Sequence, residues 1–460
     1  MTLIKSISGI RGTIGGQIDD NLTPIDAVKF ASAYGTWLKN SLNKNKIKVV
    51  VGRDARISGE MIHNLVQYTL VGLGIDVINI GLSTTPTVEI AVPLEQADGG
   101  IILTASHNPK QWNALKLLNN KGEFLSAQDG SEILQIAEQN MYEFASVDNL
   151  GQVQDNDAYM DIHVDEVLKL PLVNIQGIRE KKFRVVVDAV NSSGGIAIPK
   201  LLEELGVEVI KLYCTPNGHF PHNPEPLKEH LGDICQKVIQ EKADFGIVVD
   251  PDVDRLAFIC EDGEMFGEEY TLVACADYVL SKTKGNVVSN LSSSRALRDI
   301  AHKYGVEYFA SAVGEVNVVQ EMKRVNAIIG GEGNGGIIYP ELHYGRDALV
   351  GVALFLSLLV EKNISVRKLR ESYPAYFMSK NKIELTPTVD VDLILQKMAK
   401  QYAQEKISTI DGVKIDFADS WVHLRKSNTE PIIRIYTEAP SQDQADNLAQ
   451  RIMSEIKKIS

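Results

Sequence analysis

The chain repeats one pattern of three strand-forming segments three times, and this repeat constrains its fold more than any other feature. The first segment is a valine-rich run followed by a small or polar loop, at 49–54, 185–189 and 287–290. The second follows a helix that ends in glycine, at 74–77, 206–209 and 305–308. The third is another apolar run, at 97–102, 243–248 and 326–329. Such apolar strands alternating with helices predict three similar α/β domains with helix-covered, mainly parallel sheets.

The third strand of each repeat ends in an unusual polar loop, at 104–109, 250–255 and 330–336. Ligands of parallel sheets gather at the carboxyl ends of the strands. Because the three loops occupy equivalent positions, we expect them to share one central cleft between the three domains.

The pattern changes near residue 375 to that of a small α+β domain. Strands are expected at 383–385, 413–417, 421–425 and 432–438, and helices at 391–405 and 442–459. The predicted fold is α/β, with three similar domains of mixed, mainly parallel, helix-covered sheets plus a C-terminal α+β domain, around a central cleft. The expected domain limits are 1–150, 151–257, 258–372 and 373–460.

The acidic balance of the chain narrows its possible partners. A net charge of −13 over 460 residues argues against binding to nucleic acid or to a membrane surface, which both need basic faces. The four cysteines lack metal-site spacing and are typical of reduced thiols. The apolar run at 348–360 is too short to span a bilayer and predicts a buried helix. With no hydrophobic segment of a signal peptide at its start, the chain is expected to be cytoplasmic.

Ser106 lies in Thr-Ala-Ser-His-Asn-Pro at 104–109, directly after an apolar strand. A hydroxyl at the end of a strand, beside an imidazole and an amide, can be a nucleophile or a phosphoryl carrier if a base and a cation lie nearby. The alternative is a simple serine- and asparagine-containing turn that leads into a helix. The loop of the second repeat favours the chemical interpretation.

Asp250, Asp252 and Asp254 alternate along the loop that follows the third strand of the second repeat. Carboxylates so close together repel unless a cation joins them, and hard oxygen ligands favour Mg²⁺. Arg255 adds a guanidinium that can bind phosphate. A solvated acidic turn is the alternative, but a proline and a valine make this loop stiff and only half polar. The sequence predicts one Mg²⁺ per chain at this loop.

Two further loops carry polar groups suited to a sugar phosphate. The glycine-rich loop lacks the dinucleotide and P-loop patterns, but its Glu332 and Asn334 could bind vicinal hydroxyls; a flexible turn is the alternative. The predicted C-terminal hairpin offers a phosphate clamp, against the alternative of a solvated polar hairpin. The residues of this clamp are Arg425, Ser427, Asn428, Thr429 and Arg434.

These four motifs, in this order and over essentially the whole chain, resemble the α-D-phosphohexomutase family, which includes phosphoglucomutase/phosphomannomutase and phosphoglucosamine mutase. The resemblance implies that Ser106 carries a phosphoryl group. It also implies that Mg²⁺ is bound by the three aspartates, with an oxygen of phospho-Ser106 as a further ligand. The loop at 330–336 resembles the family's sugar-specificity loop, and 425–431 its phosphate loop.

Smaller motifs extend the resemblance. Gly-Ile-Arg-Gly at 9–12 resembles the family's N-terminal motif and implies a place for Arg11 near the phosphoserine, while Lys116 matches the active-site lysine that follows the serine. A segment at 217–226 resembles a loop of the family's second domain. Lys116 and His107 are the proton-transfer candidates, and the resemblance favours Lys116.

The implied activity interconverts hexose 1-phosphates and 6-phosphates through a hexose 1,6-bisphosphate, which also serves as the activator. The expected partner is a hexose phosphate, with a monomer or a homodimer as the oligomeric state. The sugar loop resembles those of archaeal broad-specificity members and partly those of acetylglucosamine-phosphate mutases. We expect glucosamine phosphate as the substrate, because the amide of Asn334 can face a 2-amino group; glucose and mannose phosphates are the alternatives.

Two other functions are possible for a chain with these motifs. A metal-dependent phosphatase would use Asp250 as nucleophile and Asp252 as acid, but Ser106 and the Arg425 hairpin would then have no role. A non-catalytic sugar-phosphate binding protein would lack the nucleophile or the metal ligands, and both are present.

Overall fold

The computed structural model of the protein describes residues 2–6, 9–42, 44, 46–384, 390–426 and 432–459. Its internal contacts divide the chain into two compact units. Unit 1 comprises Met1–Tyr278 and Asn334–Arg367, and unit 2 comprises Val279–Gly333 and Lys368–Ser460.

The predicted threefold repeat is present as three sheets that share one strand order. In each repeat, the first strand lies between the third and the second, and all three are parallel. The strands, in that spatial order, are β5 (Gly99–Leu103), β3 (Lys48–Arg53) and β4 (Asp76–Leu82); β10 (Phe245–Val249), β8 (Arg184–Asp188) and β9 (Glu208–Leu212); and β14 (Ile329–Glu332), β12 (Val287–Asn290) and β13 (Tyr308–Ser311). The polar loops of the first two repeats therefore leave equivalent strands, as the sequence predicts. In the third repeat the expected bounds are wrong: Asn326 caps α11, so β14 begins three residues later than expected and includes residues 330–332 of the predicted loop.

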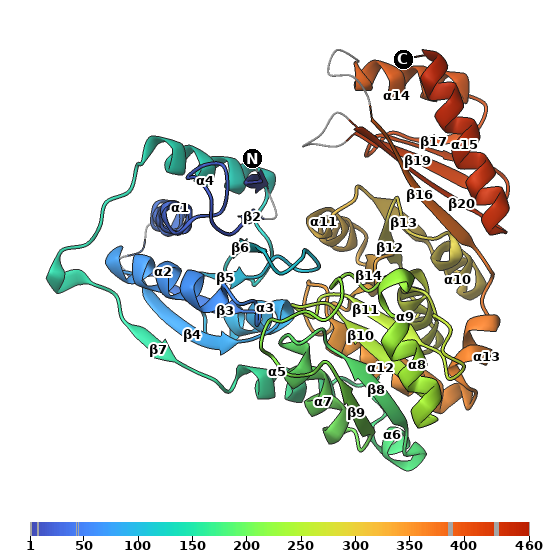
Figure 1. Ribbon diagram of the computed structural model, residues 1–460, viewed down its shortest axis with the longest axis horizontal. Coiled ribbons are helices and arrows are strands. Elements are labelled where there is room, and N and C mark those ends of the chain that lie inside the picture. The colour runs from blue at the N-terminus through green and yellow to red at the C-terminus, as the bar shows by residue number, and fades with distance from the viewer. Residues whose placement is uncertain are drawn as a thin grey trace. The chain divides into compact units, whose positions relative to one another are not determined.

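The first sheet extends beyond the repeat on both sides. Antiparallel strands β6 (Trp112–Leu118), β2 (Gly9–Thr13) and β1 (Ile4–Ser6) follow β5, and β7 (Val153–Asp155) pairs with β4. Helices α1 (Pro24–Leu42), α2 (Gly59–Gly72) and α4 (Ala127–Gln139) bury one face of the sheet, and α3 (Thr85–Leu94) buries the other (Figure 1). The antiparallel extension makes this sheet mixed.

The second sheet ends in antiparallel strand β11 (Leu256–Ile259), which carries the chain away from the aspartate loop. Its surroundings include α5 (Tyr159–Leu168), α6 (Ile175–Lys181), α7 (Gly194–Glu204) and α8 (Gly232–Glu241), with 3-10 turns at Val147–Asn149 and Lys228–His230. Helix α12 (Ala348–Lys362) follows β15 (Gly336–Ile338), and its residues 348–359 are all buried. This confirms the predicted buried helix. No helix within the described ranges is long and apolar enough to cross a membrane.

The remaining elements complete the third repeat and the C-terminal domain. They are α9 (Glu268–Lys282), α10 (Ala296–Tyr304), α11 (Glu315–Val325), α13 (Val366–Glu371), β16 (Phe377–Glu384), α14 (Val391–Gln401), β17 (Lys406–Ser408), β18 (Val413–Asp416), β19 (Trp421–Lys426), β20 (Ile432–Ala439) and α15 (Gln442–Ile459). The C-terminal sheet is antiparallel, in the order β16-β20-β19-β18-β17, and α14 and α15 bury one of its faces (Figure 1).

Two predicted element limits in the C-terminal domain are wrong. The helix expected over 391–405 ends at Gln401, because the chain turns there and residues 406–408 add an edge strand to β18. The strand expected at 383–385 begins six residues earlier, at Phe377, since it pairs along the whole length of β20. Leu385 lies outside the described residues.

Candidate active site

Ser106 lies just beyond the carboxyl end of β5, in the loop that connects β5 to β6. Its backbone adopts a left-handed conformation with φ of 49°, and its N–H donates to Thr104 Oγ1 at 3.0 Å. The buried hydroxyl donates to Oδ2 of Asp250 at 2.7 Å, although the two residues are 144 positions apart in the chain. The loop leads into a strand, so the simple turn before a helix is wrong, and the first two motifs meet at one hydrogen bond.

Arg56, which is almost completely buried, hydrogen-bonds to the backbone of the Ser106 loop. Its guanidinium donates to the carbonyl oxygens of Pro109 at 2.9 Å and Trp112 at 3.0 Å, and also to that of Ser106. Asp54 accepts from the Nε of Arg56 at 2.9 Å, which balances the buried charge. The sequence reasoning missed Arg56; its only signal was a charged segment directly after the first strand of the repeat.

The three aspartates face one another in the loop after β10. All three side chains are buried, and one ligand oxygen from each lies within 4.8 Å of the other two. The loop curls because Val253 adopts a left-handed conformation with φ of 63°, which is rare for a β-branched residue. Such strain persists only where the surroundings enforce it, and here the backbone N–H of Val253 donates to Asp250 O at 3.1 Å.

Three side chains from distant parts of unit 1 bind Asp252 and Asp254. Lys116 Nζ lies 2.7 Å from Oδ2 of Asp252 and 3.5 Å from Oδ2 of Asp254. Thr85 Oγ1 donates to Asp252 Oδ2 at 2.6 Å, and Arg346 Nη2 donates to Asp254 Oδ2 at 2.6 Å. Lys116 was predicted for the site, whereas Thr85 and Arg346 were not, because no spacing in the sequence links them to the aspartate loop.

The crowding of carboxylates shifts their pKa values in different directions. Burial, and then the charges of Asp254 and Asp252, raise the pKa of Asp250 well above its usual range. Burial also acts to raise the pKa of Asp252, but the Lys116 ammonium outweighs it and the net pKa is lowered. In turn, the aspartates raise the pKa of Lys116 despite its burial. The protein partners of the loop therefore do not fully neutralise its negative charge. Such an excess of negative charge favours the binding of a cation.

The donor set fits a divalent cation. Asp252 Oδ1 and Asp254 Oδ1 are buried, and among the described residues neither has a hydrogen-bond partner. Leaving buried carboxylate oxygens unsatisfied is costly, and a hard cation such as Mg²⁺ would satisfy them. The residues that would hold it are the three aspartates, with the oxygen on Ser106 directly beside Asp250.

The remaining residues predicted for the site at Ser106 are His107 and two arginines, Arg11 and Arg255. His107 Nδ1 lies 3.4 Å from Ser106 Oγ. Burial, and then the charge of Arg255, lower the pKa of His107 well below its usual range, and Arg11 adds to the effect. Burial, and then Arg255, also lower the pKa of Arg11 in β2. Arg255 reaches Glu225 of the 217–226 segment at 3.1 Å. An anion at Ser106 would relieve this mutual repulsion.

The glycine-rich loop holds its two predicted residues differently. Glu332, at the end of β14 in unit 2, is buried, and its Oε1 accepts from Asn290 Nδ2 at 2.7 Å and from the N–H of Gly314 at 3.1 Å. Asn334, in unit 1, is half-buried and accepts from the N–H of Gly336 at 3.3 Å. Their binding to a sugar stays a prediction.

The predicted phosphate clamp is described in part. Arg425 in β19 lies directly opposite Arg434 in β20, and Arg434 lies opposite Lys382 in β16. This row of three cations is on the face of the C-terminal sheet opposite to the buried core under α14 and α15. Arg425 Nε lies 2.8 Å from Asp411 Oδ2. Ser427, Asn428 and Thr429 lie outside the described residues. The sequence reasoning missed Lys382, because only the strand register brings it into the row.

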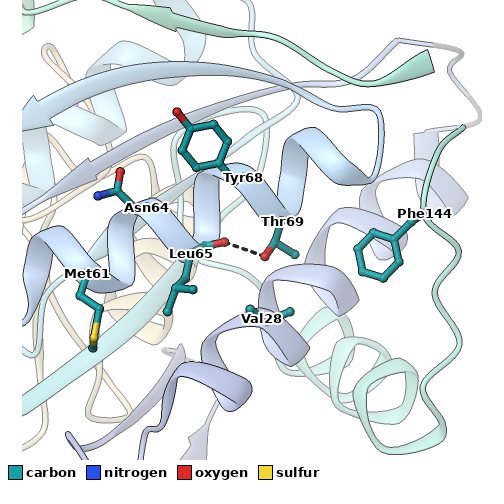
Figure 2. Close-up of a pocket in the computed structure, with 7 residues that line it drawn as sticks. All are labelled: Val28, Met61, Asn64, Leu65, Tyr68, Thr69 and Phe144. Atoms are coloured by element: carbon teal, nitrogen blue, oxygen red, sulfur yellow. Dashed lines mark hydrogen bonds between the residues drawn. The ribbon is translucent and has the colours of Figure 1, made fainter. Parts of the chain in front are cut away.

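A hollow of about 660 Å³ on the first domain offers no comparable chemistry. Figure 2 shows side chains of α2 on one side of it and Phe144 on the other, with Val28 of α1 below. The residues that line it are Val28, Met61, Asn64, Leu65, Tyr68, Thr69 and Phe144. It has no cationic side chain for a phosphate, so the site at Ser106 is the better candidate.

The comparisons with known proteins agree with this geometry. Four family profiles of phosphoglucomutase/phosphomannomutase match consecutive parts of the chain: alpha/beta/alpha domain I at residues 3–143, domain II at 161–263, domain III at 267–376 and the C-terminal domain at 383–455. The chain belongs to the phosphoglucomutase/phosphomannomutase family. It is therefore a phosphohexose mutase, an isomerase that transfers phosphate within its substrate.

Curated relatives cover nearly the whole of this family member. The phosphoglucomutase/phosphomannomutase of Thermococcus kodakarensis is 35% identical, with 94% of this chain and 95% of the relative covered. The phosphoglucosamine/phosphogalactosamine mutase of Sulfurisphaera tokodaii is 34% identical, with 98% and 97% covered.

Solved structures support the same fold. A phosphoglucomutase/phosphomannomutase family protein of Burkholderia thailandensis aligns with a TM-score of 0.84 and 25% identity, over 99% of this chain and 98% of that one. The phosphoglucomutase parafusin of Paramecium aligns with a TM-score of 0.77 over 100% and 96%, and at 19% identity it supports the fold alone. The predicted α/β architecture and family are thereby confirmed.

Proposed function

We propose that this phosphohexose mutase uses Ser106 as its phosphoryl carrier and prefers glucosamine phosphate. The observation that carries the first part is the 2.7 Å hydrogen bond from Ser106 Oγ to Asp250, which brings the hydroxyl to a cluster of three buried aspartates. The Sulfurisphaera relative, which is named as a phosphoglucosamine/phosphogalactosamine mutase, supports the second part.

The reaction has two phosphoryl transfers. In the first, the bond between phosphorus and the Ser106 oxygen breaks as a bond forms from the free 6- or 1-hydroxyl of a bound hexose monophosphate, which gives the hexose 1,6-bisphosphate. After the bisphosphate turns over in the site, its other phosphate returns to Ser106 and the isomeric monophosphate leaves. Negative charge spreads over the moving phosphoryl oxygens, so cationic side chains fixed around Ser106 lower the barrier. Arg11, Arg255 and Lys116 have this role.

The hydroxyl proton must leave the attacking oxygen and return to Ser106 when the phosphate leaves it. Lys116 and His107 remain the two candidates for this proton transfer. Lys116, held between Asp252 and Asp254, is an ammonium because the aspartates raise its pKa, and is suited to donate a proton. His107 has a lowered pKa, is uncharged at neutral pH and lies beside Ser106 Oγ, so it is suited to accept one.

The cofactors follow from the same cluster. One Mg²⁺ per chain would be held by Asp250, Asp252, Asp254 and an oxygen at Ser106, and when bound it supplies positive charge for the transferring phosphoryl group. A hexose 1,6-bisphosphate would act as the activator, because it can phosphorylate a Ser106 that has lost its phosphate. The distal phosphate of the substrate would bind the clamp around Arg425 and Arg434. The chain would act as a monomer or a homodimer.

The choice of sugar rests on the glycine-rich loop. Asn334 is half-buried, and an amide there can accept from or donate to a 2-amino or 2-hydroxyl group. The Thermococcus relative is named for glucose and mannose phosphates, so these are the second candidates.

The test is the relative turnover of glucosamine, glucose and mannose 1-phosphates, each with a catalytic amount of the matching 1,6-bisphosphate. We expect the highest kcat/KM for glucosamine 1-phosphate. A higher value for glucose or mannose 1-phosphate would overturn the proposed preference. Without added bisphosphate and Mg²⁺, we expect no turnover of any of the three substrates.

A further inference from the structure

Helix α3 holds one of the three aspartates. The helix begins at Thr85, whose backbone N–H donates to Asp252 O at 2.9 Å and whose hydroxyl donates to Asp252 Oδ2 at 2.6 Å. The first turn of α3 thus fixes both the backbone and the carboxylate of Asp252. Glu89 lies one turn further along the same helix.

The turn at residues 343–347 holds a second aspartate. Arg346 in this turn donates to Asp254 Oδ2 at 2.6 Å. The next residue, Asp347, caps α12, with Oδ1 accepting from the N–H of Leu349 at 2.7 Å and of Val350 at 3.4 Å. Since the turn is anchored to a buried helix, the position of Arg346 is set by the position of this turn.

A buried pair, Glu89 and His343, joins these two elements. His343 Nδ1 lies 3.3 Å from Glu89 Oε2, and the two side chains are 11% and 1% exposed. The turn packs against the carboxylate so closely that a Cβ on Gly345 would come within 1.8 Å of Glu89 Oε2. A side chain at 345 would therefore have to displace the carboxylate of Glu89.

A second route of contacts closes the connection. His343 Nε2 lies 3.3 Å from Asp347 Oδ2, and the same oxygen lies 2.9 Å from His163 Nε2. His163 in α5 then contacts Thr87 Oγ1 at 2.9 Å, which returns to α3. These contacts, from α3 through His163, Asp347 and His343 back to Glu89, link the two elements a second time.

The electrostatics agree with a histidine that binds both carboxylates. Burial acts to lower the pKa of His343, but its contacts with Asp347 and Glu89 outweigh burial and raise it to about 10. The pKa of Asp347 is lowered, because His163 and His343 outweigh its burial. Burial raises the pKa of Glu89, and His343 opposes that rise. Removing one partner of such a buried pair leaves the other uncompensated.

We propose that the Glu89–His343 pair is a positioning element of the metal site, which sets the distance between the carboxylates of Asp252 and Asp254. It acts by joining α3, which holds Asp252, to the 343–347 turn, which holds Asp254. The inference rests on the proposed function of the aspartate cluster as a cation site. Mutation of groups that orient metal ligands without contacting the metal weakens metal affinity on the order of tenfold or more.

The experiment measures Mn²⁺ binding to the dephosphorylated protein by electron paramagnetic resonance, without any turnover. Glu89→Gln and His343→Gln should each raise the Kd for Mn²⁺ by roughly tenfold. The double variant should raise it by about the same factor as either single variant, because the two residues act as one unit. The matched control is His63→Gln, another buried histidine of unit 1 that lies on α2. It should leave the Kd unchanged.

Three outcomes separate this inference from the proposed function. If the wild-type protein binds no Mn²⁺, or Asp252→Asn binds it equally well, the cation site itself is wrong. If the wild type binds but the folded Glu89 and His343 variants keep its affinity, the positioning role is wrong. Gly345→Ala displaces Glu89 without removing a charge and should also weaken Mn²⁺. If all of these variants fail to fold, the pair serves the fold as a whole and the proposal is overturned.

Discussion

Arg425 and Arg434 lie directly opposite each other in β19 and β20, on the sheet face opposite to α14 and α15. Like charges at opposed positions in a sheet repel and destabilise it unless an anion lies between or beside them. Asp411 is the carboxylate that contacts Arg425, at 2.8 Å. A phosphate bound at this pair would relieve the repulsion, which is why the phosphate clamp is expected here.

Arg425→Ala should raise KM for every hexose phosphate by a similar factor. The lost contact is a charge-assisted one to phosphate, worth on the order of 1.5–3 kcal/mol, or roughly ten- to a hundredfold in KM. Steady-state kinetics with glucose, mannose and glucosamine phosphates check this. Lys426→Ala is the matched control, because Lys426 is the next residue, points to the other face and pairs with Asp392 at 2.7 Å. A change in sugar ranking by Arg425→Ala would contradict its role as a clamp.

Lys382→Ala should raise KM less, by about two- to fivefold, since an exposed cation is screened by solvent. The effect should shrink at high ionic strength, because salt screens the attraction between an exposed cation and the phosphate. Lys406→Ala is the control, since Lys406 is an exposed cation in the edge strand β17, outside the row. Equal KM values for Lys382→Ala and Lys406→Ala at low salt would remove Lys382 from the clamp.

Asn334→Ala should change the ratio of kcat/KM between glucosamine and glucose phosphates, and leave the binding of the distal phosphate nearly unchanged. A hydrogen-bonding amide that reads the 2-substituent contributes about 0.5–1.5 kcal/mol, or roughly two- to tenfold in the ratio. Competition kinetics with both sugars in one reaction measure the ratio directly. The division of roles between the two loops would be wrong if this ratio stayed constant while KM rose for both sugars.

Asp252→Asn, or removal of metal with a chelator, should lower kcat by about a hundredfold or more, because the charge on the moving phosphoryl group is then poorly compensated. Sugar-phosphate binding, measured by calorimetry, should weaken far less. Asp262→Asn is the control, because Asp262 lies beyond β11 and pairs with Arg367 at 3.7 Å, outside the cluster. Full activity of the wild type in metal-free buffer would exclude the aspartate loop as a cation site.

The sequence predicts the fold well where burial has a simple period. The three valine-rich strands and their glycine-ended helices predict three equivalent sheets, and the strand order is the same in each. Ser106 and the aspartates meet because both follow the third strand of a repeat, and equivalent strand ends carry equivalent loops. The end of α14 at Gln401 was missed, because no glycine or proline marks the point where the chain turns.

The rest of the site depends on contacts that no local pattern encodes. Arg56 supports the Ser106 loop from 50 positions away, and Arg346 reaches Asp254 across 92 positions. Val253 has a left-handed backbone although it is not a glycine, so its residue type does not indicate this conformation. Lys382 joins the cation row only through the register of β16 with β20. Such partners become visible when packing brings separate elements together.

The proposed role of Ser106 is tested by locating the phosphate on the protein. Dephosphorylated protein is incubated with glucosamine or glucose 1,6-bisphosphate and Mg²⁺, and intact mass and peptide mapping then locate any phosphate. We expect one phosphate, on Ser106, and none on the Ser106→Ala protein, which should lose mutase turnover while keeping its fold. Ser83→Ala, which changes a buried serine after the neighbouring strand β4, should be phosphorylated and active like the wild type. Mutase turnover near the wild-type rate in Ser106→Ala, or a phosphate on another residue, would contradict the proposed role of Ser106.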